Sequence, residues 1–596
     1  MLHLKMTARA ILLRRLLVLV GQIACGFSLL FAPPLAAAED AKATISPDHA
    51  TRRPNILFVL ADDLGISDLG SFGSEIHTPN LDRIATRGVR LTSFAAHATC
   101  SPSRATMLTG VDSHLAGFGT MRGDATPEQI GKPGYEGYLN NRVVTIAQLL
   151  KDSGYHTYIS GKWDMGVKDE HTPDKYGFEK SYVLLQGSAD HFDEVGAMAE
   201  APVPFYRENG LPVSLPKDFY SSKNYTAKLI EFIKQRKDET QPFFAYLAYT
   251  APHYPLQAPD EFLAKYKGVY DAGYDQIREA RIQKMRDLKI IPPTMKPAAE
   301  DGVWPRWNQL SPEMKKIEAR RMEIYAAMIE AMDFHFGRLI DHLERSGELE
   351  NTFIIFLSDN GPDGSNPLDW GWSDWAEKTF NLELSNMGRR NSYAWAGPNW
   401  AHVSSSPYRL AKFFTTEGGI RVPAFVYYKN KVTSGAVIPA FANLFDITPT
   451  LLDLAGVTHP GTRYAGRDVY RPTKGKSMLP LLEGKESEIH FKNERFVWEI
   501  YNRRAVREGD WKALWINKPW GKGLGQWSLH DLSNDPAEQV DVTSQNPAIS
   551  RQLIEYWDQY SLENNIIAAP DQEVAATNRY THFQWLPPSM RPKPKQ

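Results

Sequence analysis

Four short runs of apolar residues have the length and the unbroken hydrophobicity of buried β-strands. They lie at residues 55–61, 156–160, 243–250 and 353–358. A strand that is apolar along its whole length is buried on both faces, as in parallel sheets covered by helices. Helical patterns lie between the runs, at residues 147–153 and after Ser311, an N-cap followed by Pro312. This alternation predicts an α/β fold with a large, mixed, mostly parallel sheet flanked by helices.

The pattern changes after about residue 458. Segments with strand and turn signals, such as 504–516 and 527–538, predict a small antiparallel sheet. An amphipathic stretch near 549–560 predicts one helix packed with it. The expected organisation is a signal peptide at 1–38, an exposed lead-in at 39–52, a catalytic domain at 53–458, a smaller α+β domain at 459–575 and a flexible tail at 576–596.

The first 38 residues have the features of a secretory signal peptide. They contain four basic residues and no acidic ones, a mostly apolar run from Leu16 to Phe31, and small residues at Ala36 to Ala38. No later run is long and apolar enough to span a bilayer. The mature chain is therefore expected to be periplasmic or secreted, with no membrane association after signal cleavage.

Loss of the signal peptide changes the balance of charge and leaves one cysteine. The count moves from 68 basic and 70 acidic residues to 64 and 70, a formal charge of −6. This argues against nucleic acid as a partner, because phosphates require a concentrated basic face. The remaining cysteine, Cys100, has no internal disulfide partner. An unpaired cysteine in an exported chain indicates intermolecular pairing or a reactive group.

Polar residues follow each predicted strand. The first run is followed by Asp62 and Asp63, the second by Lys162 and Asp164, the third by His253, and the fourth by Asp359 and Asn360. Taken singly, each is more typical of a turn or a cap. In open α/β sheets, however, ligands bind beyond the carboxyl ends of the strands, so we expect these residues to meet at one edge. Their carboxylate and amide oxygens suit a hard divalent cation, and spacing alone leaves both Ca²⁺ and Mg²⁺ open.

The stretch Cys100-Ser-Pro-Ser-Arg104 predicts an anion site. Pro102 suits the first turn of a helix, so Cys100 would lie at its N-terminus and Arg104 on the same face. A helix N-terminus with an adjacent arginine binds anions. From the residues alone, a cysteine nucleophile would attack a phosphate or sulfate ester, although a thiol is an unusual neighbour for a hard metal ion.

The stretch Cys100-Ser-Pro-Ser-Arg104-Ala-Thr-Met-Leu-Thr-Gly110 resembles the signature of the formylglycine-dependent sulfatases. Other segments in the order of that family are Asp62-Asp63-Leu-Gly, Gly161-Lys-Trp, Ala251-Pro-His253, Ser358-Asp-Asn-Gly361, and Lys412 before Glu417-Gly-Gly-Ile-Arg421. The chain is most similar to bacterial arylsulfatases. The resemblance implies an alkaline-phosphatase-like fold and an enzyme that hydrolyses small-molecule sulfate monoesters.

The resemblance also implies a role for each matched position. In this family a maturation enzyme converts the cysteine to formylglycine (3-oxoalanine), and the hydrated aldehyde attacks sulfur and forms a covalent sulfate intermediate. The implied ligands of one Ca²⁺ are Asp62, Asp63, Asp359, Asn360 and the modified Cys100. Arg104 would stabilise the hydrate, and Lys162 and Lys412 would hold sulfate oxygens. His253, together with Lys412, would assist the leaving alcohol.

One position departs from the family pattern, which has histidine where this chain has Asp164. A carboxylate can act as the general base for sulfate release. It also adds a negative charge that costs on the order of 4 kcal/mol at about 4 Å and an effective dielectric constant of about 20. We therefore expect Asp164 to be protonated, to be turned away, or to slow the second step.

Two other functions compete with a sulfatase, and the leaving group is open. Relatives with the same modified cysteine hydrolyse phosphonate monoesters or phosphodiesters, and an inactive sulfate-ester-binding homologue is a minor alternative. Five tryptophans between Asn360 and Lys412 either border the site or pack a long loop: Trp370, Trp372, Trp375, Trp395 and Trp400. We favour aryl sulfates as substrates.

Overall fold

The computed structural model describes residues 53–568, apart from residues 239, 300–304 and 518–524. The predicted signal peptide, the lead-in up to residue 52 and the predicted tail lie outside the described residues. None of the helices in the described part combines the length and the apolar character that a bilayer crossing needs.

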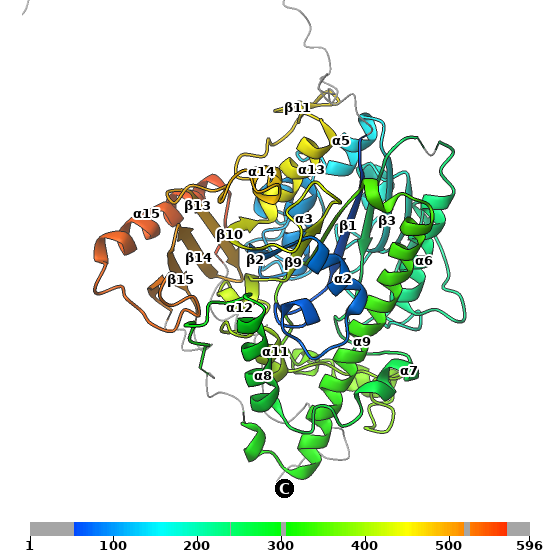
Figure 1. The fold of residues 1–596 in the computed structure, drawn as a ribbon, viewed down its shortest axis with the longest axis vertical. Helices are drawn as coiled ribbons and strands as arrows, with labels where there is room; N and C mark the ends of the chain where they lie inside the picture. The colour runs from blue at the N-terminus through cyan, green and yellow to red at the C-terminus, as the bar shows by residue number, and fades with distance from the viewer. Residues whose placement is uncertain (1–52, 239, 300–304, 518–524, 569–596) are drawn as a thin grey trace, which may run out of the picture. The chain divides into compact units, whose positions relative to one another are not determined.

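The largest element of the described chain is a ten-stranded mixed sheet (Figure 1). Its strands, in spatial order, are β10 (Val437–Asn443), β2 (Val89–Ala95), β9 (Ala424–Tyr427), β8 (Thr352–Ser358), β1 (Asn55–Ala61), β7 (Phe243–Ala248), β3 (His156–Lys162), β4 (Lys180–Leu184), β5 (Tyr206–Glu208) and β6 (Leu211–Pro212). The strands from β8 to β4 pair in parallel. The four predicted strands are β1, β3, β7 and β8, and they are neighbours, which confirms the predicted fold.

Each face of this sheet is covered by its own helices. Side chains alternate along β1, so Leu57 and Val59 belong to one apolar core and Ile56 and Phe58 to the other. The first core includes residues of α2 (Pro79–Arg87), α6 (Ser221–Lys234) and α9 (Pro312–Arg345). The second includes residues of α3 (Cys100–Thr109), α5 (Ile146–Asp152) and α13 (Ile447–Ala455). The unbroken apolar runs are thereby explained, because both sides of each strand are buried.

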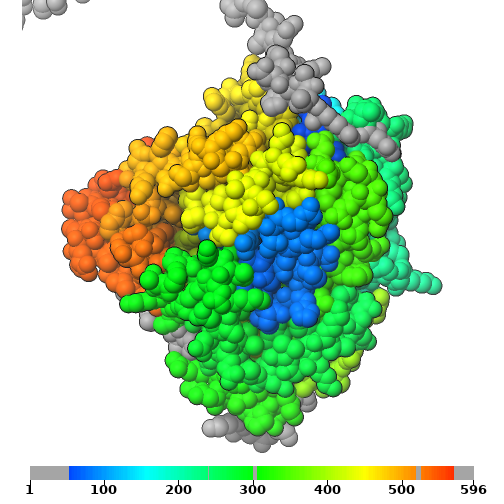
Figure 2. All heavy atoms as spheres, in the orientation of Figure 1, coloured from blue at the N-terminus to red at the C-terminus, as the bar shows by residue number. Residues whose placement is uncertain are grey.

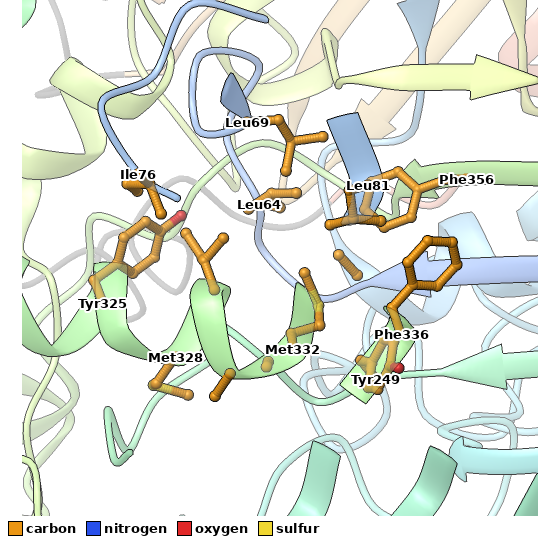
Figure 3. Close-up of a cluster of buried hydrophobic side chains, with 14 of the residues drawn as sticks. Leu64, Leu69, Ile76, Leu81, Tyr249, Tyr325, Met328, Met332, Phe336 and Phe356 are labelled. Carbon is orange, nitrogen blue, oxygen red and sulfur yellow. The ribbon is translucent and has the colours of Figure 1, made fainter. Parts of the chain in front are cut away.

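Helix α9 is the long helix that the sequence predicts. Ser311 is its N-cap, and the Ser311 hydroxyl accepts a hydrogen bond from Met314 N at 3.3 Å. Figure 3 shows apolar side chains of this helix, such as Met332 and Phe336, in the same buried cluster as Leu64 and Leu81. Full burial of side chains of this size stabilises a fold by about 1.5–3 kcal/mol each.

A second, antiparallel sheet follows near the C-terminus. Its strands are β13 (Arg495–Ile500), β14 (Arg503–Glu508), β15 (Trp511–Trp515) and β16 (Trp527–Asp531). Helix α15 (Pro547–Glu563) packs on it through Leu553, Trp557 and Tyr560. The predicted small sheet and its helix are therefore confirmed. Figure 2 shows this orange to red part beside the yellow segment that precedes it, and Met478 and Leu482 of that segment belong to the core of the large sheet.

Shorter elements connect these layers. They are α4 (Ser113–Ala116), α7 (Asp260–Leu263), α8 (Tyr274–Asp287), α10 (Ser373–Thr379), α11 (Pro398–Ser404), α12 (Glu417–Ile420), β11 (Arg463–Tyr464), β12 (Arg467–Asp468) and α14 (Leu479–Leu482). Helices α11 and α12 flank the loop that carries Lys412.

Candidate active site

The carboxyl ends of four adjacent strands bring the predicted polar residues to one edge of the large sheet. Asp62 and Asp63 follow β1, Lys162 ends β3, and Asp359 and Asn360 follow β8. Because β8, β1, β7 and β3 are parallel neighbours, these ends lie side by side. His253 joins them from the turn after β7, with its Nε2 at 3.6 Å from Asp63 Oδ2.

Two lysines form buried ion pairs with the aspartates after β1. Lys162 Nζ lies 3.0 and 2.9 Å from the two carboxylate oxygens of Asp62. Lys412 Nζ lies 2.9 Å from Asp63 Oδ2 and 3.3 Å from Asp363 Oδ2. Burial alone would lower the pKa of each lysine, but the carboxylates raise it above the ordinary value. Both lysines therefore favour the charged form.

Arg104 holds the third carboxylate. It donates to Asp359 Oδ2 from Nη2 at 2.7 Å and from Nε at 3.0 Å, and both side chains are fully buried. Burial opposes ionisation, but the Arg104 guanidinium, with the two lysines, lowers the pKa of Asp359 below its ordinary value. Arg104 Nη1 also donates to Lys162 O at 3.3 Å, which links helix α3 to the end of β3.

Cys100 is the first residue of α3, and it faces the aspartates. Its Sγ lies 3.4 Å from Asp62 Oδ1 and 3.9 Å from Asp63 Oδ1, and its side chain is fully buried. Burial raises the pKa of the Cys100 thiol well above its ordinary value, and Asp359 adds to this effect. The structure thus confirms that Cys100 lies at a helix N-terminus beside the acidic residues.

His253 is held in one orientation by the backbone. Its Nδ1 lies 2.6 Å from Tyr254 O, so Nδ1 carries a proton and donates to this carbonyl. Nε2 therefore faces Asp63. His191 Nε2 lies 3.1 Å from His253 O and braces the same turn.

Asp164 is buried and points into the site. Its backbone has a left-handed conformation, with φ at 56°. Its Oδ2 accepts a hydrogen bond from Ser101 Oγ at 2.9 Å and lies 3.8 Å from Lys162 Nζ. The expectation that Asp164 is turned away is therefore wrong, because Lys162 and the start of helix α3 attract its carboxylate.

The residues present fit a divalent cation. Ligand atoms of Asp62, Asp63, Cys100 and His253 all lie within 4.8 Å of one another. In addition, Asn360 Oδ1 is buried and has no hydrogen-bond partner in the structure, although buried polar atoms are normally paired. An orphaned amide oxygen beside carboxylates is what a hard cation would bind.

Two residues that touch the site were missed by sequence reasoning. Ser101 binds Asp164, and Asp363 lies beside Lys412. Both fall inside or next to motifs that were recognised, one position after Cys100 and two after Gly361. The sequence does not indicate where these two side chains point, because their orientation depends on contacts with other elements.

The five tryptophans mostly serve as packing residues. Trp400 is fully buried against Tyr270 and Tyr274. Trp372, Trp375 and Trp395 belong to an aromatic cluster with Tyr254, Phe380 and Tyr393. Trp370 is a partly buried member of the same cluster, and its ring centroid lies 6.2 Å from that of Tyr254 and 6.4 Å from that of Phe413. These two rings belong to residues that follow His253 and Lys412.

Comparisons with known proteins match the chain over most of its length. The family model described as Sulfatase matches residues 54–457, and that described as N-sulphoglucosamine sulphohydrolase, C-terminal, matches residues 409–560. An uncharacterized sulfatase of Schizosaccharomyces pombe (strain 972 / ATCC 24843) is 43% identical over 541 residues, covering 88% of this chain and 96% of that protein. An arylsulfatase of Klebsiella aerogenes is 38% identical over 443 residues, covering 73% of this chain and 94% of that protein.

A solved structure shares the fold. Ps i-CgsB, in complex with k-i-k-neocarrahexaose, superposes with a TM-score of 0.60 at 24% identity, covering 88% of this chain and 97% of that chain. The Sulfatase model spans well over half of the sequence, including every residue that converges on Cys100. From this match and the two similar proteins, it follows that the chain belongs to the sulfatase family of sulfuric ester hydrolases.

Proposed function

We propose that the protein is an arylsulfatase that hydrolyses small-molecule sulfate monoesters to a phenol or alcohol and inorganic sulfate. The observation that carries this proposal is the convergence of three buried cations, Arg104, Lys162 and Lys412, on the acids around Cys100. A sulfate ester is a tetrahedral anion, and preorganised cations in a dry site stabilise such a group strongly. The similarity to the Klebsiella arylsulfatase supports the same reaction.

In this proposal, one Ca²⁺ is held by Asp62, Asp63, Asp359 and Asn360, together with the modified Cys100. Calcium accepts several oxygen ligands in irregular geometry, as two neighbouring strand ends would provide. When bound, the cation would supply positive charge for the sulfate oxygens and for a deprotonated hydroxyl group. The orphaned Asn360 Oδ1 supports this ligand set.

Cys100 is proposed to be converted to formylglycine by a maturation enzyme. The hydrate of that aldehyde would supply an oxygen nucleophile where the structure has a thiol. An oxygen suits a hard cation beside Asp62 better than a neutral thiol does, since soft sulfur ligands favour other metals. Cys100 Sγ is 3.4 Å from Asp62 Oδ1, and this proximity supports a role for the modified side chain beside the proposed cation.

The remaining residues would bind the ester and transfer protons. Lys162 and Lys412 hold sulfate oxygens as charged donors. Arg104 keeps Asp359 ionised, so Asp359 can accept the proton of the nucleophile. Lys412 and His253 together would assist the leaving alcohol. Lys412 carries the proton for the leaving oxygen, because burial and the two lysines lower the pKa of His253 well below its ordinary value and its neutral ring keeps its proton on Nδ1. Proton transfer of this kind typically contributes 10²–10⁴-fold to a rate.

An aryl leaving group is favoured by the partly buried Trp370. Its ring contacts those of Tyr254 and Phe413, the residues that follow His253 and Lys412. Flat rings pack on aromatic side chains, and such pairs contribute about 0.5–1.5 kcal/mol beyond burial. We also propose that the mature enzyme works in the periplasm or outside the cell, because residues 1–38 have the pattern of a signal peptide.

The first test is the mass of the tryptic peptide Leu91–Arg104 from protein secreted by its own host. We expect this peptide to be lighter than the thiol form by the difference between a CH₂SH and a CHO group. Hydrolysis of an aryl sulfate should be lost after chelation of divalent cations and regained with Ca²⁺. An intact thiol in active enzyme would contradict the modification, and preferential hydrolysis of an aryl phosphonate would contradict the sulfatase specificity.

A further inference from the structure

The loop that carries Lys412 has a backbone conformation that needs outside support. It lies between Arg409 and Glu417, and Leu410 and Phe413 have φ values of 60° and 73°. Residues with a Cβ atom rarely adopt this left-handed conformation. Contacts from the surrounding structure must therefore hold the loop, and with it Lys412, in place.

Two such contacts come from the segments that carry the nucleophile and the acids. Lys412 N donates to Pro362 O at 3.0 Å, in the loop after β8. Phe413 N donates to Ala98 O at 2.8 Å, two residues before Cys100. The Lys412–Phe413 segment is thereby tied to both sides of the site.

The third contact comes from the C-terminal sheet. Arg503, the first residue of β14, is fully buried and donates from Nη1 to Phe413 O at 2.6 Å. Its guanidinium lies over the Phe414 ring at 4.2 Å, and its Nε donates to Asn517 Oδ1 at 3.3 Å. The planar group is thus fixed by its neighbours, so it can determine where the Phe413 carbonyl points.

The same C-terminal segment holds both ends of the loop. Arg409 Nη1 donates to Glu538 O at 2.8 Å, and Glu417 N donates to Glu538 Oε2 at 2.9 Å. Lys512 of β15 is fully buried and bridges the carboxylates of Glu417 and Glu538 at 2.8 and 2.7 Å. Removal of one partner of a buried ion pair leaves an uncompensated buried charge. The bridge from Lys512 to Glu417 and Glu538 therefore holds the loop firmly against the C-terminal sheet.

We propose that the C-terminal sheet is part of the sulfate-binding site, and that Arg503 is the residue of this sheet that positions Lys412. The inference rests on the proposed role of Lys412 in holding sulfate. Without the Arg503 donor, the Phe413 carbonyl loses its partner and Phe413 can leave its left-handed conformation. Lys412 Nζ then no longer stays at 2.9 Å from Asp63 Oδ2, and the anion loses one of its three cations.

The test is Arg503→Met, with Arg504→Met as the matched control. Arg504 is the next residue of the same strand, and its guanidinium lies over Trp515 and Trp557, on the side of α15. The dissociation constant of inorganic sulfate is measured by calorimetry on the full calcium-loaded chain, beside kcat and KM for an aryl sulfate. We expect sulfate binding to weaken about tenfold and KM to rise in Arg503→Met. Arg504→Met should bind sulfate like the wild type.

Each result has one meaning. A folded Arg503→Met with sulfate binding and KM within twofold of the control overturns the inference. If Arg503→Met does not fold, Arg503→Gln decides, because this shorter polar side chain does not reach the Phe413 carbonyl: weaker sulfate binding supports the inference and unchanged binding overturns it. If the wild type binds sulfate but hydrolyses no aryl sulfate, the arylsulfatase proposal is wrong and the inference about Arg503 still stands. A folded wild type that binds no sulfate would overturn both.

Discussion

Among single residues, Asp164 adds one carboxylate to the charged groups around Lys162. It lies 3.8 Å from Lys162 Nζ and binds the Ser101 hydroxyl. In the proposed mechanism, its carboxylate would compete with sulfate for Lys162 and would accept the proton during sulfate release. Sequence reasoning identified this position as a departure from the family, but its orientation depends on the start of helix α3.

We predict that Asp164→Asn lowers kcat about 10²-fold, because the amide cannot act as a base for sulfate release. KM should stay equal or fall, since a negative charge near the ester is removed. Rapid-quench kinetics on an aryl sulfate would show a burst of phenol and accumulation of sulfated enzyme. Asp169→Asn, at a side chain that is 81% exposed, is the control. An unchanged kcat in Asp164→Asn would exclude the base role.

At the scale of elements, helix α9 also caps the N-terminus of helix α2. Thr78, the N-cap of α2, makes no side-chain capping bond. Asp333 of α9 replaces it, because Asp333 Oδ1 accepts from Asn80 N at 3.0 Å and from Leu81 N at 2.7 Å. The apolar spacing of α9 predicts the helix, but it does not predict that one buried acid caps a neighbouring helix.

We predict that Asp333→Ala lowers the free energy of unfolding by about 1–2 kcal/mol, the usual cost of losing a helix cap. The effect should appear as a lower thermal midpoint, with the far-UV circular dichroism spectrum unchanged at low temperature. Asp341→Ala, on the same helix at a side chain that is 51% exposed, should have little effect. Equal midpoints for the two variants would show that the cap contributes nothing.

At the scale of the whole described chain, a buried histidine joins the C-terminal elements to the large sheet. His114 Nδ1 lies 3.2 Å from Asp112 Oδ1, and Nε2 lies 3.1 Å from Glu499 Oε2 of β13. Tyr560 of α15 donates to Asp112. Burial would lower the pKa of His114, but the hydrogen bonds to Asp112 and Glu499 raise it from 6.5 to about 9.

The contacts of His114 with Asp112 and Glu499 predict that the free energy of unfolding falls at alkaline pH. Because the folded-state pKa of His114 is raised, its contribution is complete below about pH 6.5 and is lost as pH rises through about 9. The rise in pKa corresponds to about 3 kcal/mol. The thermal midpoint of the wild type should fall over this range, whereas His114→Gln should be less stable and lack this fall. The exposed His77→Gln is the control, and a parallel decline in His114→Gln would refute the assignment.

The sequence by itself determined the strands, the carboxylate and amide side chains at their ends, and the family likeness, because these depend on residues that are close together along the chain. Continuous apolar runs specify buried strands, and Asp62, Asp63, Asp359 and Asn360 are recognisable where such runs end. The sheet edge that Asp62 and Asp359 share also follows from the rule that parallel strands end together.

Only the tertiary structure decided which partners these residues have. Lys412 meets Asp63 across 349 positions of the chain, and Arg503 meets the carbonyl of Phe413 across 90. Such contacts depend on the pairing order of strands and on packing between layers, which local patterns do not encode. The proposed domain boundary at residue 458 stays a prediction. The physical reason for the difference is that hydrophobic periodicity indicates only which residues are buried. The orientation of a buried charged side chain depends on the oppositely charged groups that folding brings next to it.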